Sequence, residues 1–582
     1  MPASKSTKIK SVRYNAIVSR PNPAEKNGSS EKPQAKNEDE SNIRKQELIM
    51  MTRVIEDAIK QKKEGNKSPF YELIRQINDI SNVNPNPKKL RLWCLAFSRT
   101  MHKFDATCSD LVYTLLNFNW TNHDNNLVVA YVMMLVNLVA VYPSCTEAML
   151  EMLVQNFLYK DDEVPKMEKI HGKVHYAIKT LLPSIPQEEK ELFHVLYREF
   201  PHKRESLGAY IVYVKNLLQL IEYTPSLQHK ILTLIFERMI ELDTEVQGQI
   251  DEIEDMEENL DKFNIDLHTS QDGSTDFYKS KPEEPDFEVF DDANVDNPDS
   301  DIEDSAPIVI AVDIANGIQK LDCIIKLVLD YLDYSHKNGT REQRTRLTET
   351  IFIIFKESIM YTIKSRYIQF IPFWYFSLDK LYASRFIKLL LDKLIDDEGK
   401  EITREAAAQY IASYIARAKY LVDDDVMQCM RALIQWAKNY VSAHKNLIHV
   451  RDESKHEKFY RIVQTVMYVF CFRWRDFRDT TSGNDIWSDE IKELKDIVES
   501  VFCPLKFCVE NTVKMFTFIS KSIGFMTCKE YKGTKIKNDS VLSMEEYFPF
   551  DPFRLKTCQT YLEGLYQVWE EIPEGSDEKE QL

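Results

Sequence analysis

Apolar residues recur at helical spacing along most of the chain. In the stretch 409–422 (QYIASYIARAKYLV), isoleucine, alanine and valine return every three or four positions, which predicts one buried face of a helix. The same periodicity runs through residues 46–248 and again through 307–572. No segment alternates apolar and polar residues over a length that would build a sheet. The pattern therefore predicts an all-α fold.

Three proline–serine dipeptides indicate a repeat. Ser144, Ser184 and Ser226 each follow a proline that separates an apolar helix from an amphipathic one, and these prolines lie 40 and 42 residues apart. HEAT-type helical pairs have a period of roughly 40–47 residues. We therefore predict a HEAT-type helical-repeat solenoid, in which each proline ends a helix. The serines either only cap the next helix or form a row of phosphorylatable hydroxyls on a partner-binding edge.

One uncharged run raises the question of a membrane span. Residues 127–142 (LVVAYVMMLVNLVAVY) contain no charged side chain, and Pro143 follows directly. The run is shorter than the roughly 20 residues that a helix needs to cross a bilayer. It predicts a fully buried helix of the array and no membrane partner.

Most of the negative charge lies in one insert. The formal net charge is −17, and residues 251–304 hold 21 acidic residues and three lysines, so the rest of the chain is close to neutral. Low hydrophobicity and like charge predict a long disordered acidic loop over 249–306. This loop contains Ser300, whose acidic neighbours are those that acidophilic kinases favour.

The loop and the two ends set the predicted domain boundaries. The first twenty residues contain five Lys or Arg and no Asp or Glu, which predicts a disordered basic arm over 1–45. N-terminal HEAT-type repeats follow over 46–248, C-terminal repeats over 307–572, and an acidic tail over 573–582. The basic arm lacks the apolar core of a signal peptide.

No motif in the chain predicts catalysis or a bound cofactor. Phosphate-binding loops, dinucleotide-binding glycines, HExxH and GxSxG are all missing from the sequence. The ten cysteines are scattered, without CxxC or any zinc spacing. We therefore expect no enzyme activity, no metal and no cofactor.

A basic and aromatic cluster has two interpretations. The stretch FCFRWRDFRD contains Arg473, Arg475 and Arg478 between aromatic residues. Such residues can stack on bases and hold phosphates, which would indicate nucleic-acid contact. Alternatively, a helix leaves the core here, and its arginines extend over apolar surface.

Several unusual blocks occur in a fixed order between about 200 and 556. They are FPHKRESLGAYIVYVKNLLQL, IFERMIELDTEV, RYIQFIPFWYF, YIASYIARAKYL, YVFCFRWRDFRDT, CPLKFCVENTVKMF and YFPFDPFRLK. In their order and spacing these blocks resemble the RNA polymerase I-specific transcription initiation factor family, and the helical layout extends the resemblance back to about 50.

The resemblance implies a HEAT-repeat protein with an acidic loop and no enzymatic activity. Family members bind RNA polymerase I and connect it to the core factor at the ribosomal DNA promoter, which places them in the nucleus and nucleolus. They are regulated by phosphorylation and can form homodimers when free. Weak contact with DNA is also implied.

The resemblance also implies a site at the end of the opening stretch. The family has a Leu-Ala-Arg-x-Lys element that is linked to core-factor contact, and the region around it is linked to DNA. Here the element begins with Ile415 in place of leucine and contains Arg417 and Lys419. Both cations would reach outward to an acidic surface or to phosphate. The alternative is that both extend over the surface and cap local carbonyls.

A second implied site is the polymerase-facing surface of the N-terminal repeats, which bears serines in the family. Ser144 and Ser184 fall at the corresponding turns, and Thr107 and Ser109 are further candidates. No family block surrounds these positions. A phosphate on one of them would add about −2 charge to a docking face and weaken binding.

Two other functions compete with this interpretation. One is a HEAT-repeat adaptor or scaffold with a different large partner, which periodicity alone would also allow. The other is a nucleic-acid-binding protein that uses the basic arm and the arginine cluster. The ordered blocks argue against the first, and the near-neutral charge outside the insert argues against the second.

Overall fold

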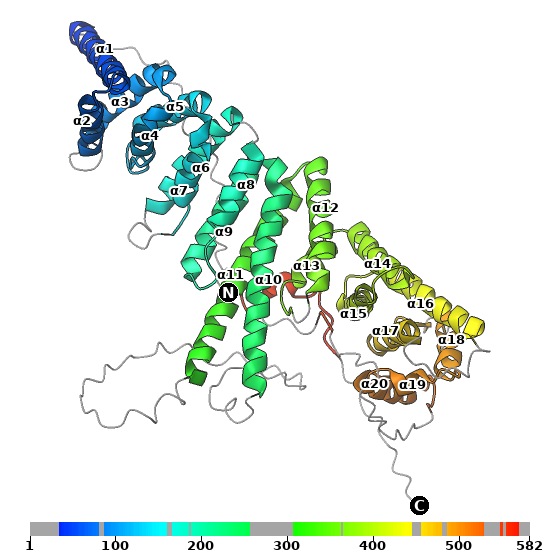
Figure 1. Ribbon diagram of the computed structural model, residues 1–582. Coiled ribbons are helices and arrows are strands. Elements are labelled where there is room, and N and C mark those ends of the chain that lie inside the picture. Colours follow the sequence, from blue (N-terminus) through cyan, green and yellow to red (C-terminus); the bar gives the residue numbers. More distant parts are fainter. Residues whose placement is uncertain are drawn as a thin grey trace, which may run out of the picture. The chain divides into compact units, whose positions relative to one another are not determined.

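In the computed structural model of the chain, most of the described residues lie in helices (Figure 1). The structure describes residues 34–80, 86–159, 166–185, 188–255, 306–362, 365–444, 456–479, 486–528, 548–550 and 555–569. Two compact units make up the chain, Met1–Tyr142 and Pro143–Leu582. The prediction of an all-α fold built from helical repeats is confirmed.

The first unit has two rows of helices. They are α1 (Gln34–Lys63), α2 (Ser68–Asn78), α3 (Pro87–Thr100), α4 (Ser109–Leu116) and α5 (Asn125–Val141), with short 3₁₀ turns η2 (Met101–Lys103) and η3 (Ala106–Cys108) before α4. Helix α3 packs against both α1 and α5, whereas α2 packs against α4 and α1. Aromatic side chains join the rows: Trp120 stacks on Tyr131, whose hydroxyl donates to the carbonyl of Leu115 at 2.8 Å.

Among the described residues, the second unit begins with a run of seven α-helices. They are α6 (Thr146–Gln155), α7 (Met167–Leu181), α8 (Glu188–Arg198), α9 (Leu207–Ile221), α10 (Gln228–Asp255), α11 (Ala306–Asn338) and α12 (Arg341–Glu357). Local capping explains two of their starts. The Ser206 hydroxyl accepts from the backbone of Ala209 to begin α9, and a reciprocal capping box between Thr340 and Gln343 begins α12.

The remainder of the second unit is also helical. Its elements are η9 (Ile359–Tyr361), α13 (Phe370–Ser377), α14 (Lys380–Ile395), α15 (Glu401–Arg417), α16 (Asp423–His444), α17 (Glu457–Arg473), β1 (Arg478–Asp479), β2 (Ile486–Trp487), α18 (Asp489–Val498), α19 (Pro504–Phe507), α20 (Glu510–Ser522) and α21 (Gln559–Leu562). Helix α15 packs between α14 and α17, and α17 in turn contacts α16 and α20. The strands β1 and β2 form a two-residue antiparallel pair.

Helices α10 and α11 pack unusually closely. A Cβ atom added to Gly317 on α11 would lie 2.6 Å from Cγ2 of Val246 on α10, so only glycine allows this approach. Asp243 of α10 is buried and accepts hydrogen bonds from the hydroxyl of Ser365 at 2.6 Å and the backbone N–H of Tyr367 at 3.0 Å. This carboxylate therefore holds the segment that leads into α13.

A segment near the end of the chain crosses several helices of the second unit. We call residues 548–550 and 555–569 the C-terminal strap. Asp322 of α11 accepts from the backbone N–H of Thr557 at 2.8 Å, and the hydroxyl of Ser413 in α15 accepts from the backbone N–H of Phe550 at 2.9 Å. The Phe550 ring packs among aromatic side chains of α13 and α15. The strap thus joins α11, α13 and α15.

Some expectations differ from the structure or lie beyond it. The apolar run corresponds to α5, which is not fully buried, because Val129 and Met133 expose 37% and 46% of their surface. Helix α1 starts at Gln34, earlier than the predicted start of the repeats at 46. No helix among the described residues is both long and apolar enough to cross a bilayer. The predicted start of the acidic loop at 249 is wrong, because α10 continues as a helix to Asp255. Ser300, residues 256–305 of the loop and the acidic tail lie outside the described residues, as does most of the basic arm.

Candidate interaction surfaces

The proline–serine dipeptides lie in short 3₁₀ turns between helices. Ser144 is exposed in η4 (Pro143–Cys145), and Ser184 is half-buried in η6 (Leu182–Ser184). The interpretation of Ser144 as a helix cap is wrong, because Cys145 occupies the N-cap of α6 and makes no side-chain hydrogen bond there. In the turn η6, the backbone N–H of Ile185 bonds the carbonyl of Leu182 at 3.0 Å. A backbone hydrogen bond of the turn thus satisfies an N–H group between the helices, a role expected of the serine hydroxyl.

Thr107 and Ser109 lie at the junction of η3 and α4. The carboxylate of Asp105 accepts from both the backbone N–H and the hydroxyl of Thr107, at 3.0 and 2.6 Å. Lys63 lies 2.7 Å from the same carboxylate, and its hydrogen bond is the main reason that the pKa of Asp105 falls to about 2. The Thr107 hydroxyl is therefore already engaged, whereas Ser109 is exposed at the first turn of α4.

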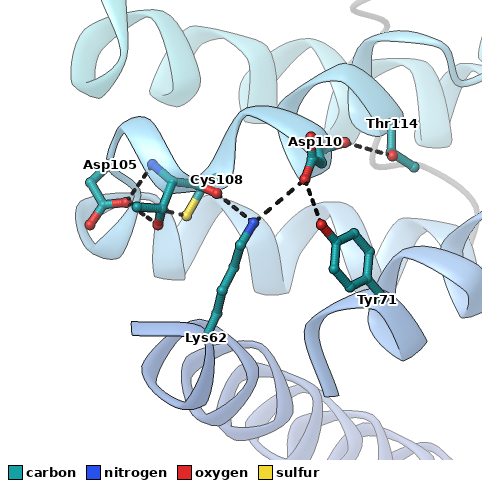
Figure 2. A network of polar contacts seen from close by, with 7 residues as sticks. Lys62, Tyr71, Asp105, Cys108, Asp110 and Thr114 are labelled. Atoms are coloured by element: carbon teal, nitrogen blue, oxygen red, sulfur yellow. Dashed lines mark hydrogen bonds and ion pairs between the residues drawn. The ribbon is translucent and has the colours of Figure 1, made fainter. Parts of the chain in front are cut away.

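Lys62 holds this junction against α1 and α2 (Figure 2). Its ammonium group lies 3.5 Å from the ring centroid of Phe70, and it donates to the carbonyl of Thr107 at 2.5 Å. It also lies 3.6 Å from the carboxylate of Asp110, which accepts from the Tyr71 hydroxyl at 3.3 Å. A single lysine thus joins α1, α2 and α4, so the position of Thr107 and Ser109 depends on it.

The opening stretch forms the end of α15, and two of its three predicted contact residues are buried. Ile415 is fully buried and Arg417 exposes only 8% of its surface, whereas Lys419 is exposed. The expectation that Arg417 reaches outward is wrong, because the C-terminal strap covers it. Lys419 keeps a fixed backbone position, since its N–H donates to the carbonyl of Leu565 in the strap at 2.9 Å.

The surroundings of Arg417 explain a cation inside an apolar helix. Its guanidinium carbon lies 4.5 Å from the ring centroid of Phe472 in α17 and 5.3 Å from that of Tyr566 in the strap. One guanidinium nitrogen donates to the carbonyl of Gln567 at 3.3 Å, and the Arg417 carbonyl accepts from the Gln567 N–H at 2.7 Å. Two aromatic faces and one carbonyl oxygen therefore lie around the charge, while the buried Nε has no hydrogen-bond partner among the described residues.

Arg473 of α17 closes the same end of α15. Its Nε donates to the carbonyl of Ile415 at 3.0 Å, another nitrogen donates to the carbonyl of Ala418, and Nη1 pairs with Asp476 at 3.1 Å. The last carbonyls of a helix have no partner within the helix, and a cation is favourable at that end. The proposal that Arg473 contacts nucleic acid is therefore wrong, because its donors are used inside the protein.

The other two arginines of the basic and aromatic cluster point to other rings. The guanidinium carbon of Arg475, which is exposed, lies 4.6 Å from the ring centroid of Trp474. That of Arg478, which is half-buried, lies 5.3 Å from the ring centroid of Trp487. With Arg473 buried, the three cations do not form one exposed basic patch.

The strap is the feature that the sequence pattern did not reveal. Residues such as Asp322, Ser413 and Gln567 gain their roles only from contacts across more than a hundred positions of the chain. The block YFPFDPFRLK is recognisable as unusual, with prolines that exclude a continuous helix. Nothing in its periodicity says which helices it crosses.

Comparisons with known proteins identify the family. The model of the family described as RNA polymerase I specific transcription initiation factor RRN3 matches residues 44–574. The chain belongs to the RRN3 family. The RRN3-family match favours transcription initiation over the adaptor and the nucleic-acid-binding alternatives.

Relatives of the RRN3 family match over nearly the whole chain. The chain is 28% identical to "RNA polymerase I-specific transcription initiation factor rrn3" of Schizosaccharomyces pombe over 91% of this chain and 88% of that protein. It is 26% identical to the mouse RRN3 protein, over 89% of this chain and 80% of that one. Against "Crystal Structure of RNA Polymerase I Transcription Initiation Factor Rrn3" the TM-score is 0.69 at 22% identity, covering 90% of this chain and 98% of that one. At that identity the structural match supports the shared fold.

Proposed function

We propose that the chain binds RNA polymerase I and brings it to the core factor at the ribosomal DNA promoter, without catalytic turnover. The observation that carries this proposal is the match of the RRN3 family over residues 44–574, which includes every helix from α2 to α21. The relatives' names describe polymerase I-specific initiation factors. The proposed activity is therefore the joining of large partners in the nucleus and nucleolus.

For the polymerase-facing surface we propose Ser144, Ser184 and Ser109 as direct contacts. Ser144 and Ser109 are exposed, and Ser184 is half-buried at the end of its turn. Thr107 has a different role, since its hydroxyl donates to Asp105. A phosphate on Thr107 would break that bond and place about −2 charge beside a carboxylate, which would disturb the junction itself.

For the core-factor surface the proposal narrows to Lys419. Among the three residues of the family element it alone is exposed, and the strap fixes its backbone. Arg417 then acts as a positioning residue that holds the strap against α15 and α17. Arg475 is the exposed member of the arginine cluster and the candidate for weak DNA contact.

Size-exclusion chromatography with purified polymerases tests the proposal. The wild-type chain should elute with RNA polymerase I and not with RNA polymerase II, and a Ser144→Asp, Ser184→Asp variant should lose that association. A Ser144→Ala, Ser184→Ala variant is the matched control, because it removes both hydroxyls without adding charge. Equal binding to both polymerases would contradict the function. Loss in both variants would show that the hydroxyls, not their charge state, matter.

Two further properties are proposed with the function. Lys419→Glu should reduce capture of the core factor while leaving polymerase I binding unchanged, with Lys169→Glu on the exposed surface of α7 as the control. The free chain should form a homodimer that dissociates when polymerase I is added, which light scattering of the eluted peaks would measure. A free monomer at all concentrations would contradict the second of these.

A further inference from the structure

Helix α3 presents a strip of cations to solvent. Lys88, Arg91, Leu95 and Arg99 recur at spacings of three or four, and all four are exposed. At 100° per residue they fall within an arc of about 80°, which lies opposite the buried Trp93. Along the helix axis the strip extends about 16 Å. We call these four residues the α3 strip.

The cations of the α3 strip are not neutralised by nearby carboxylates. Between Asp79 and Asp105 the sequence contains no acidic residue. Both of those carboxylates are already used: Asp79 lies 3.1 Å from Arg75, and Asp105 lies 2.7 Å from Lys63. Within the described part of the chain, no ion pair involves any of the three cations of the strip. The strip therefore keeps its positive potential.

The neighbouring helix presents an uncharged strip. Asn126, Val129, Met133, Asn137 and Ala140 of α5 fall within a similar arc of about 80°, and none is buried. We call them the α5 strip. Helix α3 packs directly against α5, and each strip lies opposite the face that its helix buries. The two strips therefore adjoin on the outer side of one row of helices, basic on α3 and largely apolar on α5.

We propose that the α3 and α5 strips together bind an acidic amphipathic helix of a partner protein. An exposed apolar surface bordered by charge is typical of an interaction site. A partner helix of about 11 residues would match the length of the α3 strip. Its apolar side chains would cover Leu95, Val129 and Met133, and glutamates or aspartates on one flank would pair with the cations of α3.

The apolar half of this surface argues against nucleic acid as the occupant. Three cations along about 16 Å could contact phosphates of a DNA backbone. However, Val129 and Met133 expose 37% and 46% of their surface beside them and offer nothing to phosphate. A protein helix that carries both charge and apolar side chains uses the whole surface.

Fluorescence anisotropy with a designed peptide tests the proposal on the full chain. The probe is a labelled helical peptide of about 18 residues, with leucines at i, i+3, i+4 and i+7 and glutamates on one flank. A second peptide has lysine in place of every glutamate. The wild-type chain should bind the acidic peptide and not the basic one, and binding should weaken as salt rises.

Variants then locate the binding surface. Lys88→Glu, Arg91→Glu, Arg99→Glu together should raise the Kd at least about tenfold, and Val129→Ser, Met133→Ser should raise it about three- to tenfold. The matched control is Lys169→Glu, Lys179→Glu, Lys190→Glu, which makes the same change of net charge at exposed positions of the second unit. It should leave the Kd unchanged. Circular dichroism should show equal helix content in all variants.

Four outcomes with the full-length chain would overturn the proposal. They are equal binding of both peptides, an equal loss in the matched control, an unchanged Kd in the α5 double variant, and a triple variant that loses a labelled DNA duplex but keeps the peptide. The last result would assign the α3 strip to nucleic acid. If the acidic peptide binds only after residues 256–305 are deleted, the chain's own acidic segment occupies the surface and the proposal of an external partner is wrong.

Discussion

The cations of α3 and those at the junction of α15 and α17 occupy opposite environments. Arg91 and Arg99 extend into solvent from the outer side of their helix. Arg417 and Arg473 are buried, with aromatic faces, carbonyl oxygens and a carboxylate around them. Read as a pattern, each is a cation within an apolar helix. The buried arginines therefore stabilise the junction of α15 and α17, whereas the exposed arginines of α3 are available to bind a partner. Only the packing of each helix distinguishes these two roles.

The largest expected effect on stability comes from replacing Arg473, the buried arginine that bonds the last carbonyls of α15. Arg473→Ala should lower the free energy of unfolding of the second unit by about 3–5 kcal/mol, because two carbonyls and Asp476 lose their partner in a buried site. Arg475→Ala, two positions away and exposed, should change it by less than about 0.5 kcal/mol. Thermal unfolding of the two variants measures the difference. Similar melting temperatures of the two variants would show that Arg473 does not stabilise the junction of α15 and α17.

Buried and exposed histidines differ in the same way, and the difference affects how stability depends on pH. Burial lowers the pKa of His175 and of His171 from 6.5 to about 4, and His175 is held between Asn216 and Tyr223. The folded chain therefore keeps both rings neutral, while the unfolded chain takes up protons near 6.5. Their contribution to stability is complete above pH 6.5 and falls as the pH drops towards 4, by at most about 1.4 kcal/mol per pH unit for each ring.

Denaturant titrations between pH 7 and pH 5 measure this dependence. His175→Gln should be less stable at pH 7 but should lose less stability on acidification than the wild type. His102→Gln, an exposed position next to α3, is the control and should keep the wild-type slope. A His175→Gln variant with an unchanged slope would contradict the role of burial.

A smaller loss of stability is expected at Arg417, where an uncharged side chain of similar shape can keep part of the packing. Arg417→Met keeps the contact with Phe472 and Tyr566 but loses the guanidinium hydrogen bond to the Gln567 carbonyl, whereas Arg417→Ala loses both of these side-chain interactions. We expect losses of stability of about 1 and about 2 kcal/mol, respectively. Limited proteolysis of the strap would follow the same order. Equal effects would mean that charge alone, and not packing on the rings, holds the strap.

The sequence predicted helices and repeats well because both depend on local spacing. The turns at Ser144 and Ser184 fall where the prolines indicate, since proline limits its neighbours directly. The burial of Arg417 and Arg473 could not be predicted, because their partners Gln567 and Ile415 are distant in the chain. The α3 strip could not be predicted either, because the sequence does not say which face of α3 the core leaves exposed.

The smallest expected effect is on the stability of the exposed region. Lys88→Glu, Arg91→Glu, Arg99→Glu should change the free energy of unfolding by no more than about 0.5 kcal/mol, because these side chains have no buried contact to lose. Any gain in stability would come from relief of repulsion between the three like charges, and high salt would remove it. Differential scanning calorimetry at low and high salt measures both. Destabilisation comparable to that of Arg473→Ala would mean that the three cations of α3 stabilise the fold. The proposed difference between partner-binding arginines on α3 and stabilising arginines at α15 and α17 would then be wrong.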